Sequence, residues 1–397
     1  MIPLDGGVSH MKAARRLDSL PIYVFAVLDA KLRAVRAQGI DGIKLDIGSP
    51  DGPPPASIIA TLAESANDPS RHGYAGYFGT PRLREAMVEY YASRFGVALD
   101  GADEVLPLIG SKEGIANMAL AWLDPGDLAL VPDPGYPTYR MSAYMVGADV
   151  FDMPLLEENS FLPDLEAIPS AVAERARLMW LNYPNNPTGA VAPQSFFEKA
   201  VDFCRRHDIL LCHDAPYADV CYDGYQAPSL LAVPGAKEVA VEFNSLSKSH
   251  NMAGWRVGMA VGNATALAAL VQIKSNIDSG IFLAVQDAAV TALTGDQKWL
   301  AARNAEYQRR RDILLDVLIN NWDLHVAKPQ AGLYLWPHVP AGYTSSSFAD
   351  KILLETGVSV TPGSAFGPHG EGYLRISLGQ TTERIIVAGE RLNGFKF

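Results

Sequence analysis

Cysteine, long apolar runs and a signal peptide are the features that this sequence lacks or nearly lacks. The three cysteines, Cys204, Cys212 and Cys221, are odd in number and have no metal-ligand spacing, so we expect free thiols in a reducing compartment. No stretch approaches the roughly twenty unbroken apolar residues that a membrane span needs. Residues 1–10 have no apolar signal core and are interpreted as a flexible leader, with Met11 a plausible natural start. These absences predict a cytoplasmic protein with no membrane anchor.

Positive charge is also scarce. Lys and Arg number 33 against 44 Asp and Glu, so the formal net charge is -11 at pH 7. No general positive field is left to hold a polyanion, and nucleic acid is not an expected partner. The sequence contains neither a G-x-G-x-x-G motif nor a Walker motif, which weighs against nicotinamide and nucleoside triphosphate cofactors. A small anionic substrate can still be bound by locally placed Arg or Lys.

The chain has the pattern of an α/β protein and is long enough for two domains. Residues 20–38 have helical spacing and are followed by a short strand at 42–47. Helical stretches then separate short apolar runs, which predicts a mostly parallel sheet. These runs lie at 128–131, 178–181, 209–212 and 257–261.

After residue 280 the pattern changes to a long helical region followed by strands near 332–336 and 373–378. This order predicts a smaller α+β domain. We therefore expect a large α/β domain over 49–285 and a small domain formed by 11–48 together with 286–397.

The strongest local chemical signal surrounds Lys248. A lysine beside a Gly-rich turn is in many proteins simply a solvated surface residue. Here, however, Ser245 and Ser247 supply hydroxyl groups and Arg256 supplies a fixed cation, which is what a phosphate beside a reactive lysine needs. An amine held near cations and partly desolvated has a lowered pKa and becomes a nucleophile toward an aldehyde.

Two upstream segments offer an anion site and an aromatic ring. Ser111 and Lys112 lie in a Gly-rich turn that precedes the helical stretch 115–122. The N-terminus of a helix binds anions through its free N–H groups and its dipole, although an ordinary helix start has the same pattern. Tyr136 lies between turn residues and can stack on a flat ring.

Polar residues follow two of the predicted strands. Asp214 and Tyr217 come after the run 209–212, at the carboxyl edge where α/β sheets bind ligands. A carboxylate there can pair with a protonated ring nitrogen and keep a pyridine ring cationic. His213 is turned to the opposite face by strand alternation, so we expect a structural role for it. Asn186, in the tight loop 183–189, can donate to a ring phenolate oxygen.

Arg375 interrupts an otherwise apolar strand at 373–378. A buried arginine needs an anion, and a substrate carboxylate matches its two-pronged donors. This residue is therefore a candidate for substrate binding.

With these segments in this order, the chain resembles the class I and II aminotransferases of the fold-type I pyridoxal-phosphate enzymes from about residue 20 onward. The resemblance implies pyridoxal 5'-phosphate as cofactor and a mostly parallel, seven-stranded central sheet beside a smaller α+β domain. It implies that Lys248 forms the Schiff base and shuttles the proton. It also implies cofactor contacts for Ser111, Lys112, Tyr136, Asn186, Asp214, Tyr217, Ser245, Ser247 and Arg256, and substrate contacts for Arg375, Asn186 and Gly48.

Tyr74 resembles the tyrosine that reaches the phosphate of the neighbouring subunit. The resemblance therefore implies a homodimer whose active sites are shared across the interface. It implies no metal.

Within the family, several segments are similar to those of the LL-diaminopimelate aminotransferases. They are "LIGSKEGIA", "PDPGYPTYR", "NYPNNPTGA", "SLSKSHNMAGWRVGMAVGN" and "KSNIDSGIF". This likeness implies a ping-pong exchange of an amino group between LL-2,6-diaminopimelate and 2-oxoglutarate, in lysine biosynthesis. Most of these segments surround the cofactor, and relatives that act on alanine, glutamate, aspartate or N-succinyl-diaminopimelate share much of the set.

Other classes remain as alternatives. Fold-type I carbon-sulfur lyases and aminocyclopropane carboxylate synthases use the same lysine, aspartate and arginine. A non-catalytic sensor with this fold is a remote alternative, since such proteins carry a DNA-binding segment ahead of it and here the family-like region begins almost at the N-terminus. The residues that recognise the distal end of the substrate are not evident. Asn276, Asp278 and Ser279 either contribute to it or form a helix-capping turn.

Overall fold

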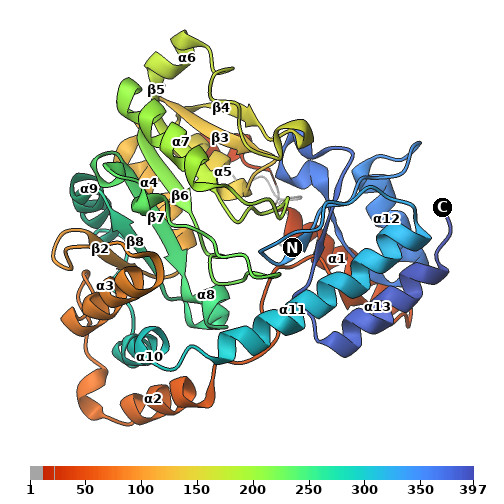
Figure 1. The fold of residues 1–397 in the computed structure, drawn as a ribbon, viewed down its shortest axis with the longest axis horizontal. Coiled ribbons are helices and arrows are strands. Elements are labelled where there is room, and N and C mark those ends of the chain that lie inside the picture. The colour runs from red at the N-terminus through yellow and green to blue at the C-terminus, as the bar shows by residue number, and fades with distance from the viewer. Residues whose placement is uncertain (1–11, 22) are drawn as a thin grey trace.

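The computed structural model describes residues 12–21 and 23–397, so the leader expected at 1–10 lies outside the described residues. Two groups of elements lie side by side (Figure 1). The larger surrounds the central sheet, and the smaller contains both α1 (Val24–Ala37) and the C-terminal elements. In the described part of the chain, no helix has the length and apolarity to cross a membrane.

The central sheet has seven strands in the order β2-β8-β7-β6-β5-β3-β4. Strand β8 is antiparallel to both of its neighbours, and the other pairings are parallel. The mostly parallel, seven-stranded sheet expected from the resemblance is thus confirmed. Its strands are β2 (Val105–Leu108), β3 (Leu128–Asp133), β4 (Asp149–Pro154), β5 (Ala176–Asn182), β6 (Leu210–Asp214), β7 (Ala240–Ser245) and β8 (Gly258–Gly262).

Helices cover both faces of this sheet because its central strands are apolar on both sides. In β5, Leu178 and Trp180 enter one core, whereas Met179 and Leu181 enter the other. The first core holds α4 (Ser111–Trp122), α5 (Pro137–Val146) and α9 (Ala264–Lys274). The second core holds α3 (Pro81–Phe95), α7 (Gln194–His207) and α10 (Leu283–Thr294), and α2 (Ala56–Ala66) packs on α10.

Two short helices lie at strand ends. Helix α6 (Ser170–Arg175) leads into β5, and α8 (Leu246–Ser249) follows β7 directly. Helix α8 therefore begins at the carboxyl end of a strand in the middle of the sheet.

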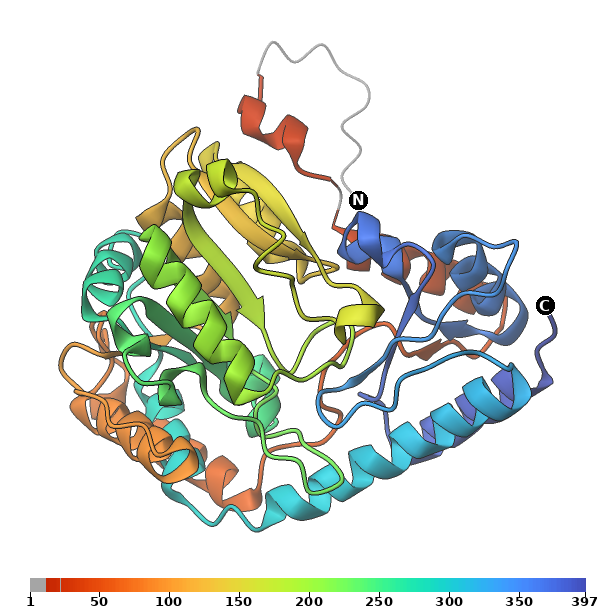
Figure 2. The same cartoon turned by 45° about the horizontal axis from the view of Figure 1, so that its top comes forward.

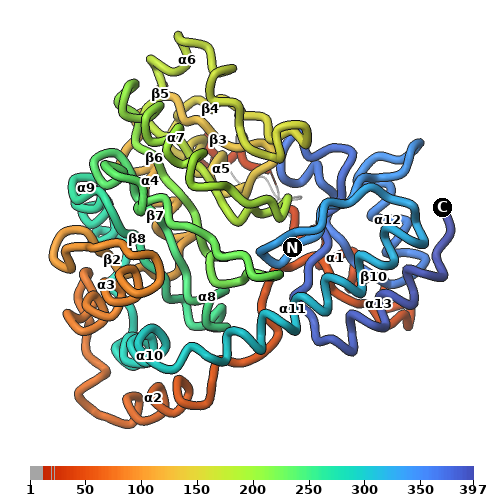
Figure 3. The backbone as a smooth tube through the Cα atoms, viewed as in Figure 1, coloured from red at the N-terminus to blue at the C-terminus, as the bar shows by residue number. Residues whose placement is uncertain are grey.

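The smaller group is built on two small sheets. Strand β1 (Ile43–Lys44) pairs in parallel with β10 (Val358–Ser359), so the N-terminal segment lies against the C-terminal part, as the trace in Figure 3 shows. The other sheet has the antiparallel order β11-β12-β9. The remaining elements are β9 (Tyr334–Leu335), β11 (Thr361–Pro362), β12 (Leu374–Ser377), α11 (Trp299–Asp316), α12 (Ser345–Thr356) and α13 (Thr382–Gly394).

Helix α11 runs from beneath the central sheet into the smaller group (Figure 2). It packs against α13 there. The domain bounds expected at 49 and 285 stay a prediction.

Candidate active site

A cavity of about 380 Å³ lies where the carboxyl ends of the parallel strands face the smaller group. Every residue that the sequence predicted for the site lines it, with the exception of Tyr74. These residues are Gly48, Ser111, Lys112, Tyr136, Asn186, Asp214, Tyr217, Ser245, Ser247, Lys248, Arg256 and Arg375. Parallel strands bring residues that are distant in sequence to one edge, which is why a single cavity collects them.

Lys248 lies in α8, immediately after β7. Its side chain is half-buried, and its ammonium donates to the carbonyl of Gly48. Burial, together with the charges of Arg375 and Arg256, lowers the pKa of this amine to about 8, and the charge of Asp214 opposes the shift. The amine is therefore closer to its nucleophilic, neutral form than an exposed lysine at the same pH.

Asp214 ends β6 and is buried in the cavity wall. Its Oδ2 accepts a hydrogen bond of 2.7 Å from the hydroxyl of Tyr139, whereas its buried Oδ1 has no partner. Burial raises the pKa of the carboxyl group to about 6, against the hydrogen bond from Tyr139 and the charges of His213 and Lys248. An unpartnered carboxylate oxygen of this kind is costly unless a donor occupies the cavity.

His213 points away from the cavity, as strand alternation predicted. Its Nδ1 lies 2.9 Å from Oε2 of Glu242, and its Nε2 lies near the backbone of Tyr183. All three residues are buried. We assign this histidine to the core.

Arg375 lies on β12 with only 2% of its surface exposed. Its Nη1 donates to Oδ1 of Asn186 over 2.8 Å and its Nη2 to the carbonyl of Asp46 over 2.5 Å, while its Nε has no partner. The Tyr334 ring lies 4.4 Å from the guanidinium. Among the described residues, no carboxylate is within ion-pair distance of Arg375, so this buried cation can accept an anion from the cavity.

The hydrogen bond from Arg375 also orients Asn186. Because Oδ1 of Asn186 accepts that bond, its Nδ2 is left to donate to another group. Asn182, at the end of β5, holds the backbone N–H of Asn186 at 2.8 Å and donates to the carbonyl of Asp214 at 2.6 Å. One amide thus ties two cavity residues together.

One end of the cavity is formed by the start of α4. This helix begins at Ser111, earlier than the stretch 115–122 that spacing predicted, so Ser111 and Lys112 lie in its first turn with free N–H groups. Gly110 precedes it with φ +75°, and a Cβ there would lie 2.2 Å from Nη2 of Arg256. Nη1 of Arg256 lies 3.5 Å from Oγ of Ser247.

An aromatic wall faces this end. The Lys112 ammonium lies 4.8 Å from the Tyr23 ring centroid and 5.9 Å from that of Tyr136. On the other side, the Tyr217 and Tyr334 hydroxyls lie 2.7 Å apart.

Several lining residues were missed by the sequence analysis. They are Tyr23, Phe25, Ile47, Asn182, Pro216, Ala253 and Tyr334. Asn182 could have been found, since it is a polar residue that ends an apolar run immediately before the loop 183–189. Tyr23, Phe25 and Tyr334 carried no such signal because they reach the cavity from the smaller group.

The remaining predicted positions lie elsewhere. The Tyr74 side chain is 93% exposed and outside the cavity. Asp278 accepts from Nζ of Lys274 at 2.7 Å and from the N–H of Gly280 at 2.8 Å, and Asn276 donates to the backbone of α9. These contacts form a turn at the end of that helix. No group of His, Cys, Asp and Glu in the described part of the chain could hold a metal ion.

The chain is similar to known proteins over nearly its whole length. The family model of aminotransferase class I and II matches residues 40–392. LL-diaminopimelate aminotransferases of Dehalococcoides mccartyi and Moorella thermoacetica are each 51% identical to the chain, over 97% and 96% of it and 99% and 98% of their own lengths. The structure of a probable N-succinyldiaminopimelate aminotransferase from Thermus thermophilus has a TM-score of 0.88 at 41% identity, covering 94% of this chain and 99% of that one. The chain therefore belongs to the class I and II aminotransferases.

Proposed function

We propose that this protein is a pyridoxal-phosphate-dependent aminotransferase that exchanges an amino group between LL-2,6-diaminopimelate and 2-oxoglutarate, in lysine biosynthesis. The choice of substrate rests on the 51% identity, over nearly the whole chain, to relatives that are named for this activity. The cavity supports the chemistry, because it joins a lysine of lowered pKa, a buried carboxylate and an arginine without an ion-pair partner.

The cavity fits pyridoxal phosphate. The unpartnered Oδ1 of Asp214 needs a donor, which a protonated pyridine nitrogen supplies. The free N–H groups of Ser111 and Lys112, with Arg256, suit a phosphate. When bound, the cofactor supplies an electron sink for the bonds at the substrate's α-carbon.

Each side chain then has a defined task. Lys248 would hold the cofactor aldehyde through its amine, and the same amine, when free, would accept and return the proton at the substrate's α-carbon. Asp214 would hold a proton on the ring nitrogen, and its burial would keep water from competing for that proton. The Nδ2 of Asn186 and the hydroxyl of Tyr217 would donate to the ring oxygen, and Tyr136 would supply an aromatic face for the ring.

The substrate is held from the opposite side. Arg375 binds the α-carboxylate through its planar donors. Gly48 leaves room for the Tyr334 side chain, since a Cβ at this position would lie 1.9 Å from the Tyr334 hydroxyl. The Lys112 side chain, held over Tyr23, offers a cation to the distal carboxylate that diaminopimelate and 2-oxoglutarate share.

A different amino donor is the second candidate. The similar Thermus structure belongs to a probable N-succinyldiaminopimelate aminotransferase, which by its name acts on a related molecule. Because the cofactor contacts are common to the family, only the distal end of the substrate separates the two candidates.

A spectral half-reaction screen tests the proposal. The purified enzyme with bound cofactor is mixed separately with LL-diaminopimelate, N-succinyl-LL-diaminopimelate, glutamate, alanine and aspartate, and the cofactor absorbance is followed. We expect rapid conversion by LL-diaminopimelate and glutamate. Failure of LL-diaminopimelate together with conversion by another donor would reject this substrate and retain the aminotransferase.

We propose in addition that the enzyme is a cytoplasmic homodimer with shared active sites. Several large apolar or aromatic side chains are exposed in a single chain. Among them are Tyr74, Phe78, Ile277 and Phe282. An interface across these residues would bury them and bring Tyr74 to a partner's phosphate end. The three free cysteines agree with a reducing compartment.

A further inference from the structure

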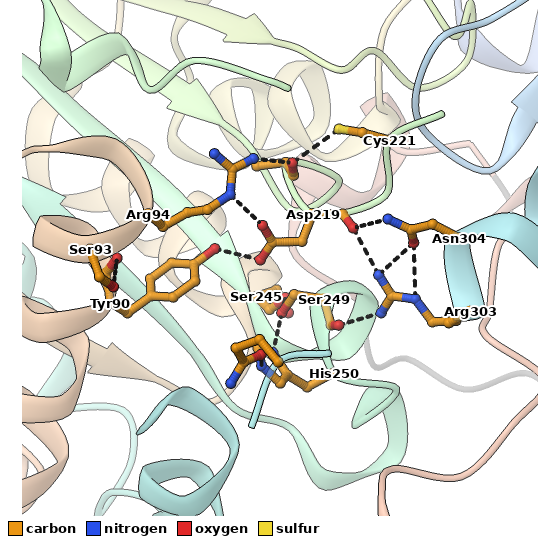
Figure 4. Close-up of polar contacts among 12 residues, drawn as sticks. Tyr90, Ser93, Arg94, Asp219, Cys221, Ser245, Ser249, His250, Arg303 and Asn304 are labelled. Carbon is orange, nitrogen blue, oxygen red and sulfur yellow. Dashed lines mark hydrogen bonds and ion pairs between the residues drawn. The ribbon is translucent and has the colours of Figure 1, made fainter. Parts of the chain in front are cut away.

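Arg303, near the start of α11, lies outside the cavity but contacts the helix that carries Lys248 (Figure 4). Its Nη1 donates to the carbonyl of Lys248 over 3.0 Å and to the carbonyl of Ser249. Helix α8 ends at Ser249, so its last carbonyls have no partner within the helix. The guanidinium therefore caps the C-terminal end of α8.

The same guanidinium also holds a second segment. Its Nη2 donates to the carbonyl of Asp219 over 2.8 Å, and Nδ2 of the adjacent Asn304 donates to the same carbonyl over 2.9 Å. The Oδ1 of Asn304 accepts from Nη2 of Arg303 at 2.9 Å, which fixes the orientation of both side chains. This segment follows Asp214 and contains Tyr217.

The Asp219 side chain is anchored from the opposite side. Its Oδ2 accepts from the hydroxyl of Tyr90 at 2.7 Å, and its Oδ1 accepts from Nε of Arg94 at 2.8 Å (Figure 4). Both donors lie on α3, and the Asp219 side chain is 5% exposed. The segment is thus held between two helices.

We propose that Arg303 is a positioning residue for the aminotransferase reaction, fixing the helix that bears Lys248 against the segment that follows Asp214 and bears Tyr217. One planar group bonds backbone carbonyls of both segments, so it sets the separation between the amine and the ring-binding residues. Lysine cannot do the same, because its ammonium has no rigid fork of donors. The proposal rests on the role assigned to Lys248 in the proposed function.

The test compares Arg303→Met and Arg303→Lys with Arg311→Met in the full-length protein. Arg311 is a fitting control because it lies on the same helix, is fully buried and likewise donates to a backbone carbonyl, that of Pro329 at 2.8 Å, but does not touch α8. The first readout is amide hydrogen exchange across 246–252 and 215–220, with and without pyridoxal phosphate. The second is kcat and KM for the amino donor.

We expect both Arg303 variants to lose protection in these two segments by about tenfold or more, and kcat to fall about 10²-fold while KM changes less than about threefold. Arg311→Met should lower thermal stability without either effect. Exchange in Arg303→Met equal to that in Arg311→Met, or full recovery of kcat in Arg303→Lys, would overturn the proposal. Arg303→Lys keeps the test valid if the methionine variant does not fold.

A separate experiment distinguishes failure of the proposed function from failure of the role proposed for Arg303. Borohydride treatment of the wild-type enzyme with its cofactor should label Lys248, and an unlabelled Lys248 would reject the proposed function. The exchange measurement on the cofactor-free protein does not depend on that result.

Discussion

At the scale of single residues, burial shifts two opposite charges toward neutrality. It lowers the pKa of Lys248 to about 8 and raises that of Asp214 to about 6. The physical cause is the same in both, because a low-dielectric cavity disfavours whichever form is charged. A nucleophilic amine and a carboxyl group ready to accept a donor thus follow from one environment.

The lowered pKa of Lys248 predicts how the cofactor-free protein reacts with pyridoxal phosphate. Because the pKa is about 8, the amine loses its proton as the pH rises through this value. The rate of covalent capture should therefore rise between pH 6.5 and 8.5 and then level off. Peptide mass spectrometry after borohydride reduction measures the product. Lys248→Ala is the control, and labelling of another lysine to the same extent in that variant would contradict the assignment.

Arg375 is predicted to affect substrate binding far more than cofactor binding. Removing its buried donors by Arg375→Ala should raise KM for the amino donor about 10²-fold or more, because a carboxylate then loses charge-assisted hydrogen bonds. The affinity for pyridoxal phosphate, measured by absorbance titration, should change less than about threefold. Arg375→Lys should recover part of the loss, and an equal loss of both affinities would move Arg375 into a structural role.

The raised pKa of Asp214 predicts a pH-dependent stability of the cofactor-free protein. The folded carboxyl group holds its proton up to about pH 6, whereas the unfolded one loses it near pH 4, so this contribution is fully present below pH 4 and lost by pH 6. The amount is on the order of 3 kcal/mol. Asp214→Asn removes the titration, and urea unfolding of both proteins at pH 4.5 and 7 measures it. An unchanged difference between the two pH values would contradict the shift.

At the scale of elements, the start of α4 combines a left-handed glycine with a close side chain. Gly110 has φ +75°, and an added Cβ would meet Arg256. The helix N-terminus, Arg256 and Ser247 converge there because no side chain stands between them. A glycine is needed for two separate reasons, backbone conformation and space.

Two glycine variants separate these reasons. Gly110→Ala should destabilise the protein and weaken pyridoxal phosphate binding at least tenfold, because Arg256 is displaced. Gly39→Ala is the matched control, since Gly39 also has a positive φ (+84°) but a Cβ added there would have no atom within 4 Å. It should cost about 1–2 kcal/mol of stability and leave cofactor affinity unchanged. Equal affinities in the two variants would remove Arg256 from the anion site.

Sequence patterns predicted four of the strands in the central sheet. The runs at 128–131, 178–181, 209–212 and 257–261 correspond to β3, β5, β6 and β8, since fully buried strands are apolar on both faces. Strand β7 carries the buried polar residues Glu242 and Asn244, and β4 is a half-exposed edge strand, so neither has an unbroken apolar run. The sense of β8 was not visible either, because direction depends on the connection and not on composition.

At the scale of the whole molecule, the position of Tyr74 predicts subunit complementation. If Tyr74 completes a partner's site, a hybrid of Lys248→Ala and Tyr74→Ala chains contains one site with both defects and one without either. Mixing the two inactive or weakened variants should therefore recover activity, up to about one intact site per hybrid dimer. Lys248→Ala mixed with itself is the control, and exchanged subunits without any recovery would contradict a shared site.

The sequence by itself determined the family, the α/β class and the polar cavity residues at strand ends and in tight loops, Asn182 excepted, because such groups stand out from apolar runs. Only the tertiary structure decided that Tyr23, Phe25 and Tyr334 line the cavity, that Asn186 presents its Nδ2 and that Arg303 caps the helix of Lys248. The physical reason is the distance along the sequence between the residues that interact. A local pattern records whether a residue is buried or turned, whereas a contact between segments that are distant in sequence depends on how the two groups of elements pack.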